Sequence, residues 1–272
     1  HAVVGNVLSV LLKDDLLAYD GVADAWTRPP GPPAGHRGGR LVDLGGRPAV
    51  IAEERRTEEA AADAVYDPTS RSWTKLPADP LGPSFDRVLT DTPAGAVLTG
   101  KKLVPQPGSA EPAIVRAALL SRDLQTWKRL PDSDLIGGYT WSWTGKRMID
   151  PSLGSADGGE VDGWGRSVPY GGSFDPVTRT WDRLLNAPEQ AAGRNAWPVD
   201  ALGGPVSARD GYLHDDRTGT WDRITRPDGA PPYPGSAAWL GDTLFVLGGQ
   251  FDYAGGPQRL SGSAWSLTVG TA

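Results

Sequence analysis

The sequence lacks several residue types, and each absence narrows its function. None of the 272 residues is cysteine, so disulfides, thiolate zinc sites, iron–sulfur clusters and cysteine nucleophiles are excluded. The histidines are only three, His1, His36 and His214. No H-E-x-x-H zinc motif, G-x-S-x-G elbow, P-loop or dinucleotide fingerprint occurs. We therefore expect no cofactor, and any site must combine residues from distant parts of the chain.

Long apolar runs and an excess of positive charge are also missing. The longest apolar run, residues 7–12, is far shorter than the roughly 18 to 20 residues that cross a bilayer, so we expect no transmembrane segment. The formal net charge is −6, and no basic stripe is present. Because phosphate contacts need a basic surface, we expect no nucleic-acid partner.

Glycine, proline and tryptophan are abundant instead. The chain holds 36 Gly, 25 Pro and 11 Trp, without a Gly-X-Y period. So many tryptophans are unusual for a disordered or fibrous chain. The composition is typical of a globular protein with many turns.

Five segments share one internal spacing, in which an Asp or Ser lies six residues before a Trp. The pairs are Asp20 and Trp26, Asp67 and Trp73, Ser121 and Trp127, Asp175 and Trp181, and Asp215 and Trp221. The Trp positions recur every 40 to 54 residues, which indicates a structural repeat. An Asp side chain that accepts a backbone N–H bond predicts a turn, and we expect each Trp to fill the space between packed sheets.

Upstream of each segment, and once more near the end of the chain, two apolar strands flank a Gly turn, as hairpins require. Six such hairpins predict six repeats of four antiparallel strands. The sequence therefore predicts an all-β fold, a six-bladed β-propeller forming a single domain over residues 1–272. The expected blades span residues 1–30, 36–77, 86–131, 138–185, 194–226 and 235–272.

The pattern resembles the kelch repeat of β-propellers, which has about 50 residues, a double Gly after the second strand and a spaced Tyr and Trp. The match is best at LFVLGGQ, which carries Gly248 and Gly249. The other repeats replace the double Gly, so the array is a degenerate kelch-like one. The resemblance covers nearly the whole chain and implies the fold more strongly than an activity.

The sixth repeat is incomplete in this sequence. Trp265 falls in its third strand, and the chain reaches Ala272 before an Asp turn and a Trp strand. We expect residues preceding His1 to supply the missing outer strand. The alternative is a terminal blade of three strands.

Four repeats carry long insertions between their second and third strands, at residues 53–63, 101–114, 151–172 and 250–263. A repeat array needs no such insertions for stability, and loops on a rigid scaffold commonly bind ligands, so we place the functional face there. The mixed-charge run at 53–59 is expected to be a solvated, self-paired loop. Aromatic residues of the insertions suit sugar rings or partner side chains, or alternatively cover their own loops; they are Trp164, Tyr170, Phe251 and Tyr253.

Connections between blades place further candidates just before first strands, and we expect them around one channel mouth. The predicted ligand-binding residues are Arg37, Arg87, Tyr139, Arg194 and Tyr233 from these connections, with Trp164 and Tyr253 from the insertions. Arg side chains bind carboxylates or phosphates with two hydrogen bonds, which would suit an acidic sugar. The alternative is that each Arg binds neighbouring loop carbonyls. Adjacent carboxylates, such as Asp215 and Asp216, are interpreted as turn formers, with a calcium site as the alternative.

Two kelch-like families bear on activity. The copper radical oxidases require a Cys cross-linked to a Tyr, so the absence of Cys excludes their chemistry. The sialic-acid mutarotases are similar in blade count and in Arg at the channel mouth, and this resemblance implies a location outside the cytoplasm. Our leading hypothesis is a non-catalytic module that binds a carbohydrate or protein. The alternative is a sugar mutarotase or isomerase with an Arg and carboxylate site.

Overall fold

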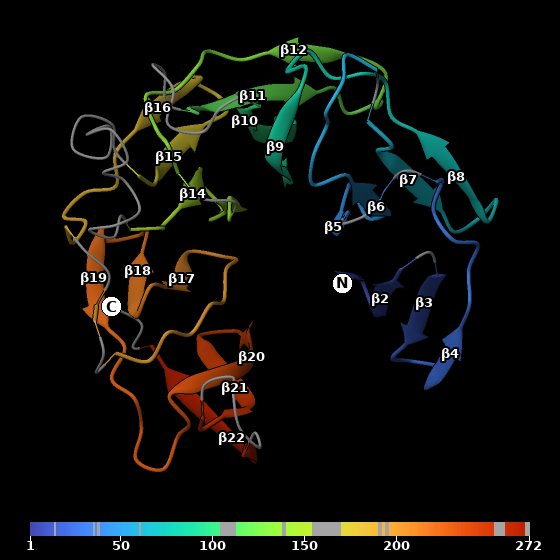
Figure 1. The fold of residues 1–272 in the computed structure, drawn as a ribbon. Coiled ribbons are helices and arrows are strands. Elements are labelled where there is room, and N and C mark those ends of the chain that lie inside the picture. Colours follow the sequence, from blue (N-terminus) through green and yellow to red (C-terminus); the bar gives the residue numbers. More distant parts are fainter. Residues whose placement is uncertain are drawn as a thin grey trace. The chain divides into compact units, whose positions relative to one another are not determined.

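The computed structural model describes residues 1–13, 15–34, 36, 39–59, 61–103, 113–137, 140–153, 170–189, 192–193, 196–252 and 259–269. The regular structure of this described part is entirely β-strand, in six antiparallel sheets of three or four strands (Figure 1). The predicted fold class is confirmed: the protein is an all-β, six-bladed β-propeller. We number the sheets blade 1 to blade 6 in chain order.

The chain divides into two compact units. Unit 1 comprises residues 1–141 and 175–181, and unit 2 comprises residues 142–174 and 182–272. Within every sheet, strands that follow one another in the sequence are hydrogen-bonded neighbours, so each blade is a simple meander.

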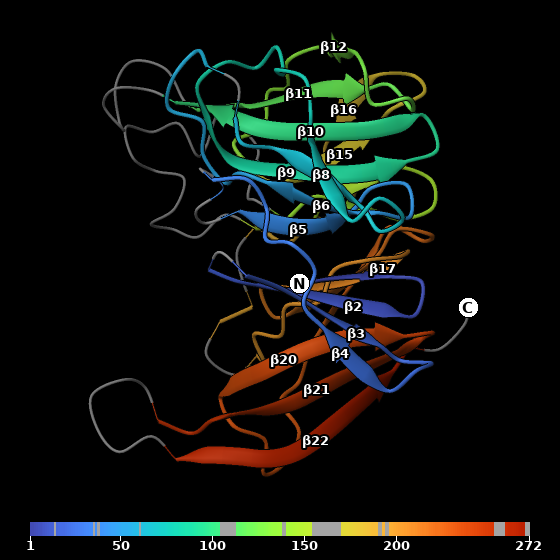
Figure 2. The ribbon, with the colours of Figure 1, turned by 90° about the vertical axis from the view of Figure 1, so that its right-hand side faces the viewer.

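Unit 1 contains blades 1 to 3, and Figure 2 shows β9, β10 and β11 of blade 3 side by side. The strands are β1 (Ala2–Val4), β2 (Val7–Leu12), β3 (Asp15–Asp20) and β4 (Ala25–Thr27) in blade 1; β5 (Arg40–Asp43), β6 (Pro48–Ile51), β7 (Ala64–Asp67) and β8 (Ser72–Lys75) in blade 2; and β9 (Ser84–Thr92), β10 (Gly95–Lys102), β11 (Val115–Leu120) and β12 (Trp127–Arg129) in blade 3.

The remaining blades follow, and residues 175–181 at the end of blade 4 group with unit 1. The strands are β13 (Ser142–Trp143), β14 (Met148–Asp150), β15 (Gly172–Asp175) and β16 (Thr180–Asp182) in blade 4; β17 (Val206–Arg209), β18 (Tyr212–Asp215) and β19 (Thr220–Arg223) in blade 5; and β20 (Tyr233–Leu240), β21 (Thr243–Gln250) and β22 (Leu260–Thr268) in blade 6.

Blades 5 and 6 have three strands each in the described part of the chain. In blade 5 the predicted first strand is reduced to one bridge between Ala201 and Ala208, in a segment interrupted by Pro198 and Pro205, which cannot donate to a ladder. In blade 6, β20, β21 and β22 lie side by side in Figure 2. Blade 6 therefore has three strands, and an outer strand from residues preceding His1 stays a prediction.

The repeated Asp residues form the turns that the sequence predicted. The Asp67 carboxylate accepts the Thr69 N–H at 2.8 Å, and the Asp175 carboxylate accepts the Val177 N–H at 2.7 Å. The bond from Thr69, with one from Ser70, lowers the pKa of Asp67, because both stabilise its charged form. The repeat thus places a charged turn former between its third and fourth strands.

The repeated Trp residues of blades 2 to 5 each donate an indole N–H bond to the preceding blade. The Trp73 indole N–H donates to the Pro30 carbonyl at 2.8 Å, and Trp127 donates to Pro77 at 2.8 Å. Two further bonds, from Trp181 to Pro131 and from Trp221 to Leu185, have the same form. In all four cases the acceptor lies four residues after the preceding repeat's Trp. The Trp spacing therefore reflects a hydrogen bond as well as packing.

Candidate functional site

The structure describes two of the seven predicted ligand-binding residues. Arg87 lies within β9 and Tyr233 begins β20, so both belong to first strands rather than to the connections before them. These strands begin earlier than predicted because Ser84 pairs with Arg55 and Tyr233 pairs with Gln250. The other five lie outside the described residues: Arg37, Tyr139, Trp164, Arg194 and Tyr253.

Arg87 is fully buried between blades 2 and 3, in an ion-pair network. Its Nη2 donates to Asp63 Oδ2 at 2.7 Å and to Asp79 Oδ2 at 2.9 Å, and its Nη1 donates to the Ala52 carbonyl at 2.9 Å. Burial by itself lowers the pKa of Arg87, but the two carboxylates outweigh it and raise the pKa above its usual value. Arg87 is therefore charged and held by protein groups, and a role in ligand binding stays a prediction.

Arg55 extends the network into the insertion of blade 2. Its guanidinium donates to the carbonyls of Thr57, Glu58 and Glu59 at 3.1, 2.5 and 2.8 Å, and its Nη1 lies 3.3 Å from Asp79 Oδ2. The expectation of a solvated charge run is therefore wrong for Arg55, which is 5% exposed, although Arg56 is exposed and pairs with Glu54 as expected. Buried Arg side chains need such acceptors, and here they hold the loop in one shape.

The same insertion is joined to β9 through its backbone. The Arg55 N–H donates to the Ser84 carbonyl at 2.7 Å, the Ser84 N–H donates back at 2.8 Å, and the Arg87 N–H donates to the Glu53 carbonyl at 3.2 Å. Together with the buried network, these bonds join residues 53–59 of the blade 2 insertion to the sheet of blade 3.

A cavity of about 420 Å³ lies beside this network. Its walls come from the insertions of blades 2 and 3 and from the connection between these blades. The lining residues are Arg55, Glu58, Asp79, Pro80, Leu81, Gly82, Pro83, Lys102, Leu103 and Arg116. We call this space the loop cavity. It lies where the insertions predicted a functional face, within unit 1 alone, and its size falls in the range of small-molecule sites.

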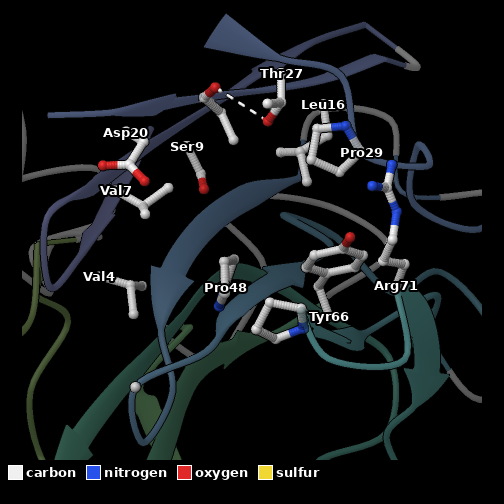
Figure 3. A pocket seen from close by; sticks show the side chains of 13 residues that line it. Val4, Val7, Ser9, Leu16, Asp20, Thr27, Pro29, Pro48, Tyr66 and Arg71 are labelled. Carbon is white, nitrogen blue, oxygen red and sulfur yellow. Dashed lines mark hydrogen bonds between the residues drawn. The ribbon is translucent and has the colours of Figure 1, made fainter. Parts of the chain in front are cut away.

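A second cavity of about 400 Å³ lies between blades 1 and 2 (Figure 3). Its walls are mainly apolar and include Val4, Val7 and Pro48, while the Ser9 and Tyr66 side chains face the space between the sheets. The Asp20 carboxylate on its wall already accepts the Val22 N–H at 2.8 Å, as a turn former. This cavity is lined mainly by apolar side chains, with Arg71 as the one cation among its described lining residues, and is the weaker candidate for specific recognition.

Unit 2 contains a buried polar interface between blades 4 and 5. Arg147 donates to Asp216 at 2.7 Å and to the Ser173 hydroxyl at 3.0 Å. Nearby on blade 5, Ser207 lies opposite His214, whose ring nitrogens are buried without a hydrogen-bond partner among the described residues. Burial lowers the pKa of His214, and Arg147 lowers it further against the opposing effect of Asp216. These effects favour the neutral form of the His214 imidazole over the charged form.

Among the aromatic residues of the insertions, Phe251 packs against its own loop. The Arg259 guanidinium carbon lies 4.6 Å from the Phe251 ring centroid, and the Phe251 N–H donates to the Arg259 carbonyl at 3.0 Å. Phe251 is thus covered by its own insertion, as in the alternative that the sequence left open.

Two features are absent from the described part of the chain. Within the described ranges, no group of three or more His, Asp or Glu side chains could hold a metal ion. Likewise, no helix among the described residues is long and apolar enough to span a membrane.

No family model and no curated protein matches the chain. The fold is therefore established by the structure, and the kelch resemblance rests on the repeat residues alone.

Proposed function

We propose that the protein is a non-catalytic binding module, located outside the cytoplasm, that presents the insertions between second and third strands to a carbohydrate or protein partner. The main support is the pairing of a rigid loop with an open cavity. The Arg55 network fixes the blade 2 insertion at the edge of the loop cavity before any ligand arrives. A loop that is already ordered loses little conformational entropy on binding, which favours affinity.

The carboxylates of the loop cavity favour binding over acid–base catalysis. Asp79 Oδ1 accepts the Leu81 N–H at 2.9 Å, and Oδ2 accepts Arg87 at 2.9 Å and faces Arg55 at 3.3 Å. Since both oxygens are engaged, Asp79 is poorly placed to exchange a proton with a substrate. Glu58 is the remaining carboxylate in the described lining of the cavity.

A sugar mutarotase or isomerase remains the second candidate, because the loop cavity does bring together Arg and carboxylate side chains. This function would place proton transfer on Glu58, with Arg116 or Lys102 binding the substrate. The two functions differ in one measurable property: only the enzyme accelerates the exchange of sugar anomers.

A loop variant tests the binding function. Replacing Arg56, Glu58 and Glu59 by Ser changes the exposed side chains but leaves the backbone carbonyls that Arg55 binds, so the loop keeps its shape. We expect the variant to lose binding to glycans or proteins that the wild type retains on an array. Arg71→Asn is the control, because Arg71 lies beyond the other end of β7, at a φ of 52° that Asn tolerates.

Two results would contradict the proposal. Equal binding by the loop variant and the wild type would show that the insertion of blade 2 is not the binding surface. Faster anomer exchange in nuclear magnetic resonance spectra of added sugars, abolished by Glu58→Gln, would instead establish the enzyme.

A further inference from the structure

We infer that the loop cavity binds the carboxylate or phosphate group of a small ligand through Lys102 and Arg116. The inference rests on the proposed function for the location of the binding surface, and it adds the chemical class of the ligand. It depends on which charges around the cavity are already neutralised and which are not.

The buried half of the charge cluster is internally balanced. Two cations, Arg55 and Arg87, face two carboxylates, Asp63 and Asp79. Asp63 Oδ1 also accepts the Ala52 N–H at 2.8 Å, in addition to Arg87 at 3.1 Å. These carboxylates are committed to the network, so they leave no negative charge to neutralise the cations at the cavity wall.

Arg116 has one distant ion-pair partner among the described residues. Its Nε is buried and makes no hydrogen bond to them, and the nearest paired carboxylate, Asp132 Oδ2, lies 3.9 Å away. Asp132 is itself bound by Arg129 through both oxygens, at 2.9 and 3.2 Å. The Arg116 side chain is 21% exposed, and a buried guanidinium nitrogen ordinarily finds an acceptor, since its desolvation is costly.

Lys102 differs from the lysine beside it. Lys101 donates to Asp86 at 3.0 Å and lies 5.7 Å from the Phe85 ring centroid, so its charge is neutralised. Lys102 is exposed at the end of β10, lines the cavity and has no ion pair within the described part of the chain. Its ammonium group is free to move toward a ligand.

The strand register places both cations on one face of blade 3. Arg116 on β11 pairs with Gly100 on β10, and Lys102 lies two residues beyond Gly100, so the side chains share a face. Arg87 belongs to this face too, because its Cγ lies 3.3 Å from the Cβ position of Gly100. Gly100 thus leaves room for the Arg87 side chain, and Arg116 and Lys102 lie on the same face of blade 3, beside the cavity.

The rest of the lining selects the ligand further. Pro80, Leu81, Pro83 and Leu103 provide apolar contacts for the body of a small molecule, and Glu58 repels a second negative charge. The arrangement therefore favours a small, largely uncharged body that carries one carboxylate or phosphate group, since both groups accept several charge-assisted hydrogen bonds.

The experiment measures calorimetric binding of glucuronate, inorganic phosphate and glucose to the full chain. Glucuronate and glucose differ mainly in the carboxylate, and phosphate tests the other anion without a sugar. We expect the anions to bind and glucose to bind at least tenfold more weakly, and we expect salt to weaken the anions. Phosphate binding alone, or glucuronate binding alone, identifies which group the cavity accepts and supports the inference.

Three variants locate the site. Lys102→Met and Arg116→Gln should each weaken anion binding by roughly 10- to 100-fold, the range of a charge-assisted hydrogen bond. Lys128→Met makes the same lysine change at an exposed position of β12 and should leave binding unchanged. If Arg116→Gln fails to fold by circular dichroism, Lys102→Met decides, because Lys102 is exposed.

Three outcomes would overturn the inference. They are no binding of either anion at millimolar concentration, equal affinity for glucose and glucuronate, and unchanged anion binding in Lys102→Met. None of them removes the proposed function, which the loop variant of Arg56, Glu58 and Glu59 tests separately through the partners on the array.

Discussion

The two blade interfaces of unit 1 are built on the same repeat but are filled differently. Between blades 1 and 2, the buried core of the described residues is formed by Ala2, Leu16, Leu41, Val50 and Ala64, beside an apolar cavity. Between blades 2 and 3, eleven buried hydrophobic residues form the core, and the side toward the insertions holds the ion network and the loop cavity. The repeat therefore determines which strands face each other at an interface, whereas the buried side chains and cavities differ from one interface to the next.

The largest expected effect comes from breaking the ion network. Arg87→Met leaves Asp63 buried without a cation and Asp79 with Arg55 alone, which should lower the free energy of unfolding by about 3 to 5 kcal/mol. Arg71→Met, an exposed cation beside the apolar cavity, should change it by less than about 0.5 kcal/mol. Urea denaturation of both variants checks this, and equal losses would refute the contrast between the two interfaces.

The next effect concerns apolar packing. Leu98→Ala in the dense core of blades 2 and 3 should cost about 3 to 5 kcal/mol, because it opens a new cavity among buried neighbours. Leu16→Ala should cost about 2 to 3 kcal/mol, since Leu16 already borders the apolar cavity and loses fewer contacts. The measurement is again the free energy of unfolding, and a larger loss for Leu16→Ala would mean that the cavity is filled in solution.

The two interfaces share one feature, the indole hydrogen bond from a repeat Trp to the preceding blade. Trp73→Phe and Trp127→Phe each remove one N–H bond, to Pro30 and Pro77, and keep an aromatic ring. Each should cost about 0.5 to 1.5 kcal/mol, and the two losses should agree closely. Thermal unfolding of the pair measures this, with Trp26→Phe as the control, because Trp26 is 58% exposed and makes no such bond within the described residues.

The smallest effect extends the comparison to the interface of blades 4 and 5. There the buried His214 ring makes no hydrogen bond to the described residues. The pKa of His214 is lowered in the folded state, chiefly by burial and also by Arg147, so the unfolded chain binds a proton more readily. The stabilisation by neutral His214 is complete above the unfolded pKa near 6.5 and declines as the pH falls below it. Asp215 and Asp216 oppose the shift.

His214→Phe should therefore weaken the loss of thermal stability between neutral pH and mildly acidic pH. The matched control is Ser207→Ala, which changes the residue opposite His214 without removing a titrating group, and should keep the wild-type pH dependence. Identical pH profiles for His214→Phe and the wild type would show that His214 is not the titrating group.

The sequence predicted the fold because the repeat is local. Asp67 accepts a hydrogen bond from Thr69 in its own turn, and a Gly between two apolar strands likewise acts within a few residues. Such short-range features can be recognised in the sequence alone. Four of the five repeat Trp residues bind the preceding blade through an indole hydrogen bond, which the sequence did not predict, and Trp26, at 58% exposure, does not fill a space between sheets as expected. The signal was present in the Pro or Leu that lies four residues after each of the first four repeat Trp residues.

The site was predicted less well, because its residues act across blades. Arg55 and Arg56 are adjacent in one charged run, yet Arg55 is buried and Arg56 is exposed. Arg87 meets Asp63 and Asp79 from 24 and 8 residues away. Nothing in the local pattern separates these carboxylates from the turn-forming ones, and Lys101 and Lys102 are equally alike in sequence.

The sequence by itself determined the number of blades, the turns and the location of the insertions, since these follow from short-range backbone preferences repeated along the chain. Only the tertiary structure decided which charges are neutralised and which line a cavity. The physical reason is that burial and pairing depend on neighbouring blades together. Asp79 is paired with Arg55 and Arg87, whereas Arg116 is 3.9 Å from Asp132 and Lys102 has no ion pair among the described residues, so these two cations of the loop cavity are the less neutralised ones.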